Sequence, residues 1–96
     1  MAIMSGQTTV VTAGTPVRMA PNGNSCNGPV TVKALSTNTG NMFVGNVNDA
    51  LPANNGFMLA KGESIVLNFV NDVGDIWVDA SVNGEKVCWI MGIWKL

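Results

Sequence analysis

Residues 75–91 read Asp75-Ile76-Trp77-Val78-Asp79-Ala80-Ser81-Val82-Asn83-Gly84-Glu85-Lys86-Val87-Cys88-Trp89-Ile90-Met91, the clearest β-pattern in the chain. Every second side chain from Ile76 to Val82 is apolar, and after the Asn83-Gly84 pair the same holds for Val87, Trp89 and Met91. This period of two is typical of a strand with one buried face. Asn-Gly between two alternating runs favours a type I′ turn, whose two central residues need positive φ. We therefore predict a hairpin in which these two strands pair with each other.

Shorter β-like runs precede this hairpin at nearly regular spacing, and residues that favour turns separate them. The runs cover residues 7–12, 17–19, 30–35, 42–45 and 64–69, with Gly62 in a tight turn before the last. No segment has the pattern of an amphipathic helix. The spacing predicts one all-β domain over residues 7–96, a small antiparallel β-sandwich or β-barrel, for which a jelly-roll-like arrangement is possible. Residues 1–6 are expected to form a flexible N-terminal arm.

The composition indicates a protein that associates with other subunits. Of its 96 residues, 11% are charged and 47% are hydrophobic, whereas an average soluble domain has about 25% charged residues. Uncharged Asn, Thr, Ser and Gly cover part of the surface, and the remainder is expected to be apolar. Because isolated monomers rarely expose large apolar patches, we expect an oligomer or a component of a larger assembly.

The charge pattern argues against nucleic acid and membranes as partners. The net charge is −1, and the five basic residues are scattered along the chain. A protein that binds a nucleic-acid backbone needs a basic stripe that releases counterions. A membrane-surface helix needs basic residues on one face of an amphipathic pattern. Residues 1–6 also lack the charged and apolar regions of a signal peptide.

Few residues carry chemistry. The chain has no histidine, so a nucleophile activated by a His base is excluded. Asp72 and Asp75 flank a glycine as in a loose calcium loop, but Asp is common in turns, and the structural interpretation is favoured. Cys26 and Cys88 can form a bridge or remain free thiols, and free thiols are favoured; two thiols alone cannot complete a zinc site. We expect no enzyme activity, no cofactor and no metal.

The conspicuous side chains are tryptophans and a C-terminal apolar segment. Trp89 shares a strand face with Val87 and Met91 and is predicted to lie in the core. Trp77 lies on the strand face that carries Asp79, where it could serve as an interface anchor, fill a core or form a ligand platform. The predicted interface residues are Trp77, Ile90, Ile93, Trp94, Leu96, Ile3 and Met4.

Three stretches of turn and strand residues stand out in roughly residues 30–92, two-thirds of the chain. They are Val32-Lys33-Ala34-Leu35-Ser36-Thr37-Asn38-Thr39-Gly40 with Met42-Phe43-Val44-Gly45, then Leu59-Ala60-Lys61-Gly62-Glu63-Ser64, then Asp75-Ile76-Trp77-Val78-Asp79-Ala80. With these stretches, the chain resembles small virion proteins of tailed phages. These motifs are turn and strand signatures, and they bring no catalytic residues with them.

The resemblance implies a structural virion protein, most directly a capsid decoration or cement protein that stabilises the head by binding across capsid subunits. Its implied partners are the major capsid protein and itself, as a homotrimer, on the capsid surface after synthesis in the host cytoplasm. A neck, tail or fibre component would have a similar sequence. The alternative from another class is a carbohydrate-binding module that uses Trp77 or Trp94 as a stacking platform for a glycan.

Overall fold

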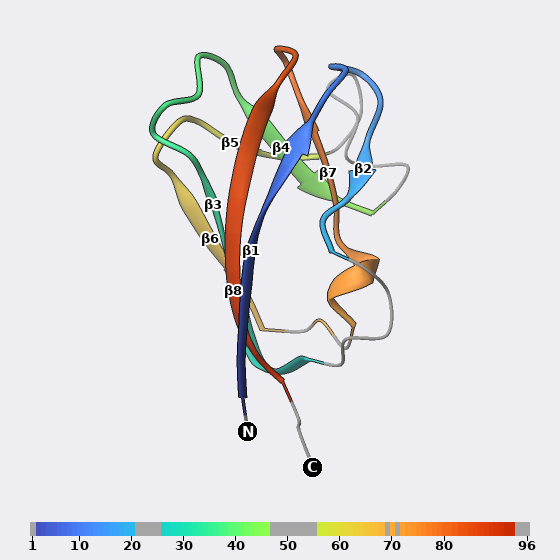
Figure 1. The fold of residues 1–96 in the computed structure, drawn as a ribbon, viewed down its shortest axis with the longest axis vertical. Coiled ribbons are helices and arrows are strands. Elements are labelled where there is room, and N and C mark those ends of the chain that lie inside the picture. The colour runs from blue at the N-terminus through green and yellow to red at the C-terminus, as the bar shows by residue number, and fades with distance from the viewer. Residues whose placement is uncertain (1, 21–25, 47–55, 69, 71, 94–96) are drawn as a thin grey trace.

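The computed structural model describes residues 2–20, 26–46, 56–68, 70 and 72–93. Within them, eight strands form two four-stranded antiparallel sheets that lie one over the other (Figure 1). Sheet A has the order β1 (Ala2–Val10), β8 (Glu85–Ile93), β3 (Cys26–Ala34) and β6 (Ser64–Leu67). Sheet B has the order β2 (Val17–Arg18), β7 (Trp77–Ala80), β4 (Met42–Gly45) and β5 (Phe57–Leu59). A single 3-10 turn, η1 (Val73–Asp75), precedes β7.

The strand order is that of a jelly roll. The first strand pairs with the last, β2 pairs with β7, β3 with β6 and β4 with β5, all antiparallel. A long hairpin of four strand pairs takes this order when it rolls up into two sheets. The all-β sandwich predicted from the sequence is confirmed. No helix in the described part of the chain is long and apolar enough to span a membrane.

The predicted hairpin at Asn83-Gly84 is wrong, because β7 and β8 lie in opposite sheets. In a sandwich the inward faces of two strands from facing sheets carry the same alternation as one face of a hairpin, so the pattern fits both arrangements. Gly84 has a φ of 81°, but no described residue other than glycine has positive φ, so Asn83 cannot complete a type I′ turn. The Gly84 N–H instead donates to the Val10 carbonyl at 2.8 Å and leads the chain across to sheet A.

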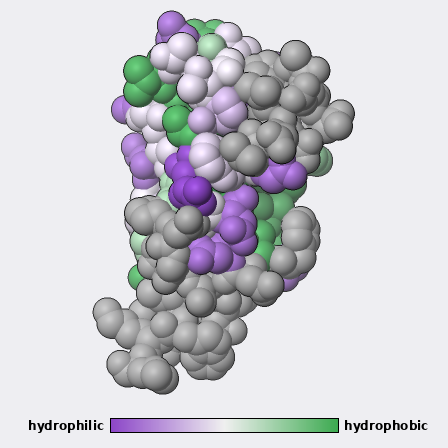
Figure 2. Space-filling model, turned by 90° about the vertical axis from the view of Figure 1, so that its right-hand side faces the viewer, coloured by the Kyte–Doolittle hydropathy of each residue, from purple (hydrophilic) through white to green (hydrophobic). Residues whose placement is uncertain are grey.

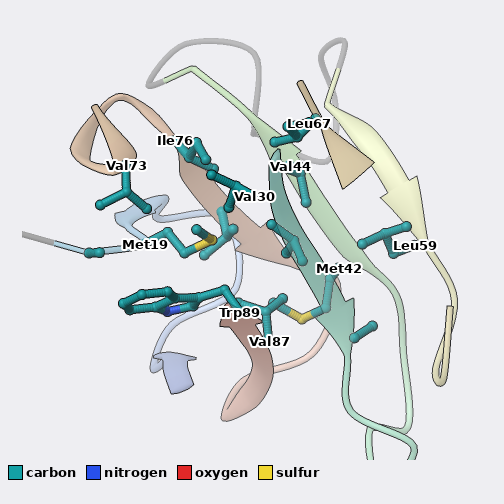
Figure 3. Packing of buried hydrophobic residues seen from close by; sticks show 14 of the residues in the cluster. Met19, Val30, Met42, Val44, Leu59, Leu67, Val73, Ile76, Val87 and Trp89 are labelled. Carbon is teal, nitrogen blue, oxygen red and sulfur yellow. The ribbon is translucent and has the colours of Figure 1, made fainter. Parts of the chain in front are cut away.

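The core fills the space between the sheets. Hydrophilic and hydrophobic side chains are interspersed over the described surface on the side of the molecule where β2 lies (Figure 2), whereas apolar side chains gather between the sheets (Figure 3). Trp89 lies in this cluster with 7% of its surface exposed, which confirms its predicted core position. The other buried apolar residues come from both sheets and from the segments after β2 and before β7: Val10, Met19, Ala20, Val30, Val32, Ala34, Met42, Val44, Leu59, Leu67, Val73, Ile76, Val78, Ala80, Val87 and Met91.

Residues 2–6, expected to form a flexible arm, instead form the first half of β1. They pair in register with β8 from Ala2 opposite Ile93 to Gly6 opposite Trp89. The alternation of this segment explains the pairing, since Ile3 faces outward while Met4 packs against the core. Gly6 is required beneath the indole, because a Cβ at this position would lie 2.8 Å from Cζ2 of Trp89. This strand was not predicted from the sequence because most of its residues are small or polar.

The turn predicted at Gly62 is confirmed. Its φ is 81°, in the region that favours glycine. The Glu63 N–H donates to the Ala60 carbonyl at 2.9 Å, and the Glu63 side chain accepts from the Ala60 N–H at 2.7 Å. These bonds close the connection between the edge strands β5 and β6 and join sheet B to sheet A.

Candidate interaction surfaces

The Glu85 carboxylate holds the β3–β4 connection in place through hydrogen bonds. It lies at the start of β8 with 7% of its surface exposed. Its Oε1 accepts from the Thr39 N–H at 2.6 Å, from the Gly40 N–H and from the Thr39 hydroxyl at 3.1 Å. Burial alone would raise the pKa of Glu85, but these hydrogen bonds outweigh burial and hold its pKa below the ordinary value. The buried Asn38 side chain adds two bonds to the Lys86 backbone, so the β3–β4 connection is clamped onto β8.

Two further acidic side chains, Asp79 and Asp72, also accept hydrogen bonds from backbone N–H groups. Oδ1 of the fully buried Asp79 accepts from the Gly14 N–H at 3.0 Å and from the Ala80 N–H at 2.8 Å, which holds the turn after β1 against β7. Its Oδ2 has no hydrogen-bond partner among the described residues. Asp72 caps η1 by accepting from the Gly74 N–H at 2.8 Å, as the structural interpretation of this acidic pair predicted. The described residues hold no cluster of side chains that could bind a metal ion.

The outer side of sheet A is a broad surface with exposed apolar side chains, which we name face A. Register places Ser5, Ile90, Thr31 and Val66 in one row across the four strands. Ile3, Val66 and Ile90 are exposed over 76%, 51% and 48% of their surface. The charged side chains on the outward positions of these strands, within the described residues, are Lys33 and Lys86. Face A therefore offers a partner apolar contacts edged by positive charge.

The structure brings together two of the predicted interface residues and separates others. Ile3 and Ile90 are diagonal neighbours on face A, since Ile3 lies opposite Gly92 on the adjacent strand. Met4 points the other way, half-buried against the core. The Ile93 side chain, Trp94 and Leu96 lie outside the described residues. Sequence reasoning missed Val66, although its alternation with Ile65 and Leu67 was a usable signal.

Trp77 lies on the opposite layer, on the outer side of sheet B, which we name face B. Face B consists of Arg18, Phe43, Met58 and Trp77, which occupy neighbouring strands. The Arg18 guanidinium lies 4.8 Å from the centroid of the Trp77 ring, and its Nη1 donates to the Gly74 carbonyl at 2.6 Å. Phe43 and Trp77 are half-buried and Met58 is exposed over 56% of its surface. Phe43 and Met58 were missed by sequence reasoning because each lies in a short strand.

Cys88 is a free thiol on face A, half-exposed. Register places Cys26 opposite Ile93, five residues from Cys88 along β8. At about 3.4 Å per residue this is roughly 17 Å, whereas a disulfide needs Cα atoms within about 7 Å. The backbone positions thus rule out a bridge within one chain.

A cavity of about 420 Å³ lies between the sheets at the end formed by β4, β5 and β6. Its described lining is apolar apart from Asn46 and Asp75, and includes Val44, Phe57 and Ile76. One carboxylate cannot form the pair that acid–base hydrolysis of a glycoside requires. The described lining of this cavity therefore lacks the carboxylate pair of a glycosidase.

Comparisons of the chain with protein-family models, with curated proteins and with solved structures found no match. The geometry alone defines the class: a small jelly-roll sandwich with some exposed apolar side chains on the outer face of each of its two layers.

Proposed function

We propose that this chain is a structural subunit of a phage particle, of the capsid decoration or cement type, which packs across other protein subunits. The observation that carries the proposal is the presence of exposed apolar side chains on both outer faces of the sandwich: Ile3, Val66 and Ile90 on face A, and Met58 beside half-buried Phe43 and Trp77 on face B. A protein that holds two neighbours together needs two such surfaces.

The size of the surface agrees with this function. The folded chain exposes 5250 Å², and a standard interface buries about 800 Å² of each partner. Two interfaces would cover nearly a third of the chain, and that share accounts for a composition so poor in charge. Neighbouring subunits of the major capsid protein are the proposed partners of the two faces, on the outside of the head.

The fold is compatible with the proposal without deciding it. Jelly rolls occur in viral capsid proteins and in lectins, and a fold by itself does not determine function. The carbohydrate-binding alternative has less support at Trp77, because Arg18 already stacks on the ring that would receive a sugar. Its other platform, Trp94, lies outside the described residues. A neck, tail or fibre position remains the alternative within the particle.

Replacing Ile90 by aspartate should weaken binding to phage heads about tenfold, the loss typical of an anchor at the centre of an interface. Ile90 is on the central strand β8, so the new carboxylate would be desolvated in the contact without disturbing the core. The measurement is cosedimentation of purified protein with heads that lack it, over a range of protein concentrations. Val82→Asp, which also charges an exposed apolar position but lies in the connection between β7 and β8, is the matched control.

Heads that bind neither the wild-type protein nor either variant would overturn the proposed function. Equal binding by wild type and Ile90→Asp would retain a virion role but remove face A as the docking surface.

A further inference from the structure

The first strand forms an unprotected sheet edge. β1 is at the end of sheet A and spans nine residues, Ala2–Val10, without a charged residue or a proline. The other three edge strands, β6, β2 and β5, have four, two and three residues. Natural proteins shorten, charge or cover their edge strands, because an open row of backbone groups invites another strand to pair. Because β1 is neither short nor charged, its open edge is available for pairing with another strand.

The hydrogen-bond pattern shows which backbone groups of β1 point away from the sheet. The Leu35 N–H donates to the Lys86 carbonyl of β8, while the Ala34 N–H donates to the Glu63 carbonyl beside β6. The backbone N–H and C=O groups of successive residues in an antiparallel strand point to opposite neighbours. The backbone groups of the even-numbered residues of β8 therefore point to β3. The backbone groups of the odd-numbered residues of β8 then point to β1, where register places Met4, Gly6 and Thr8 opposite them. The backbone groups that point outward are those of Ile3, Ser5, Gln7 and Thr9.

Within the described part of the chain, no other segment bonds to these four residues. The Gly84 N–H reaches β1 only at the Val10 carbonyl, and the Thr8 hydroxyl turns inward to the Met19 carbonyl. Ile3, Ser5, Gln7 and Thr9 are all exposed. In Figure 1, β1 runs alongside β8 at the end of its sheet.

We propose that β1 pairs antiparallel with β1 of a second copy of the chain, about a two-fold axis at Gly6. This register pairs Ile3 with Thr9 of the second copy and Ser5 with Gln7 of the second copy. In each of these pairs the two residues form two backbone hydrogen bonds with each other, so all four residues whose backbone groups point outward are used. The interface is self-complementary, as a two-fold axis requires, and the two strands match in length.

Charge favours this edge over a face as the contact between copies. β1 carries no charge, so its self-pairing opposes no like charges. Stacking face A on face A would place Lys33 and Lys86 of both copies, four positive charges, in one interface. Edge pairing instead joins the two A sheets into one eight-stranded sheet with both copies of face A on the same side. The resulting surface is free for a third partner, and the pairing does not depend on that partner being a capsid.

Replacing Ser5 by proline tests the pairing. Proline removes an N–H that points to the open edge and leaves the β1–β8 bonds intact, as is tolerated in edge strands. Light scattering across a concentration series should give about 20 kDa for the wild type, twice the chain mass of 10.0 kDa, and a halved mass for Ser5→Pro. Thr31→Lys, which changes the same row of face A on the central strand β3, should keep the dimer. Far-UV circular dichroism checks that Ser5→Pro is folded.

Amide hydrogen exchange of the wild type gives a readout that needs no variant. The amides of Ile3, Ser5, Gln7 and Thr9 should become protected as protein concentration rises, while those of exposed turns should not change. A wild-type monomer, a homotrimer of about 30 kDa, or a dimer that Ser5→Pro leaves intact while these amides exchange freely would each overturn the proposal.

Discussion

Replacing Trp89 by alanine is expected to lower the free energy of unfolding by about 3–5 kcal/mol. The indole lies on the inward face of the central strand β8 and is 7% exposed. Its Nε1–H donates to the Thr8 hydroxyl at 3.2 Å, so truncation removes both packing and a buried hydrogen bond. Small domains have only about 5–15 kcal/mol of stability in total. The measurement is urea unfolding followed by circular dichroism.

Two variants make this result interpretable. Trp89→Phe keeps an aromatic ring but loses the N–H, and should cost clearly less than the alanine variant. Trp77→Ala removes the same side chain from face B, where it is half-buried under Arg18, and should also cost less. A larger loss for Trp77→Ala than for Trp89→Ala would contradict the assignment of inner and outer faces.

Replacing Glu85 by alanine is expected to cost about 1–3 kcal/mol, because the N–H groups of Thr39 and Gly40 lose a charged acceptor in a partly buried site. The matched control is Glu63→Ala, whose carboxylate accepts one hydrogen bond in an exposed turn. Its loss should stay below about 1 kcal/mol. Equal losses for the two variants would show that the Glu85 clamp does not stabilise the fold.

The same carboxylate predicts the direction of the pH dependence. Its pKa is lowered in the folded protein, so the unfolded chain takes up a proton first as the pH falls below about 5. The stabilisation from Glu85 is therefore complete above the unfolded pKa and is lost as the pH falls through the folded pKa. Glu85→Gln, which keeps the shape of the side chain, should flatten the acid limb of unfolding free energy against pH. An unchanged acid limb would contradict the lowered pKa.

The alternation of side chains predicted the inner and outer faces but not the strand partners. Val87 and Trp89 were placed in the core, and Trp77 on the face away from Ile76 and Val78, because parity along a strand is a local property. Whether β7 pairs with β8 or faces it across the core depends on contacts with strands that are distant in the sequence. Both arrangements bury the same side chains, and the choice depends on β1 and β3 occupying the two sides of β8.

The candidate surfaces were predictable only in part for the same reason. Ile3 and Ile90 were each predicted as interface residues, but their proximity comes from the pairing of the first strand with the last. The segment of residues 2–6 looked like an arm because Ser5 and Gly6 are poor strand formers in isolation. Gly6 is in fact needed to admit the Trp89 ring, a requirement set by a residue far along the chain.

The most direct test of face A as a packing surface is the labelling rate of Cys88. This thiol lies on β8 opposite Gln7 of β1, and its side chain is on face A rather than in the plane of the sheet, so edge pairing of two copies through β1 leaves it accessible. In a Cys26→Ser background, a thiol-specific reagent should label Cys88 at least about tenfold more slowly on phage heads than in free protein, since interface cores are desolvated. Labelling at the same rate on heads and in solution would contradict the docking of face A.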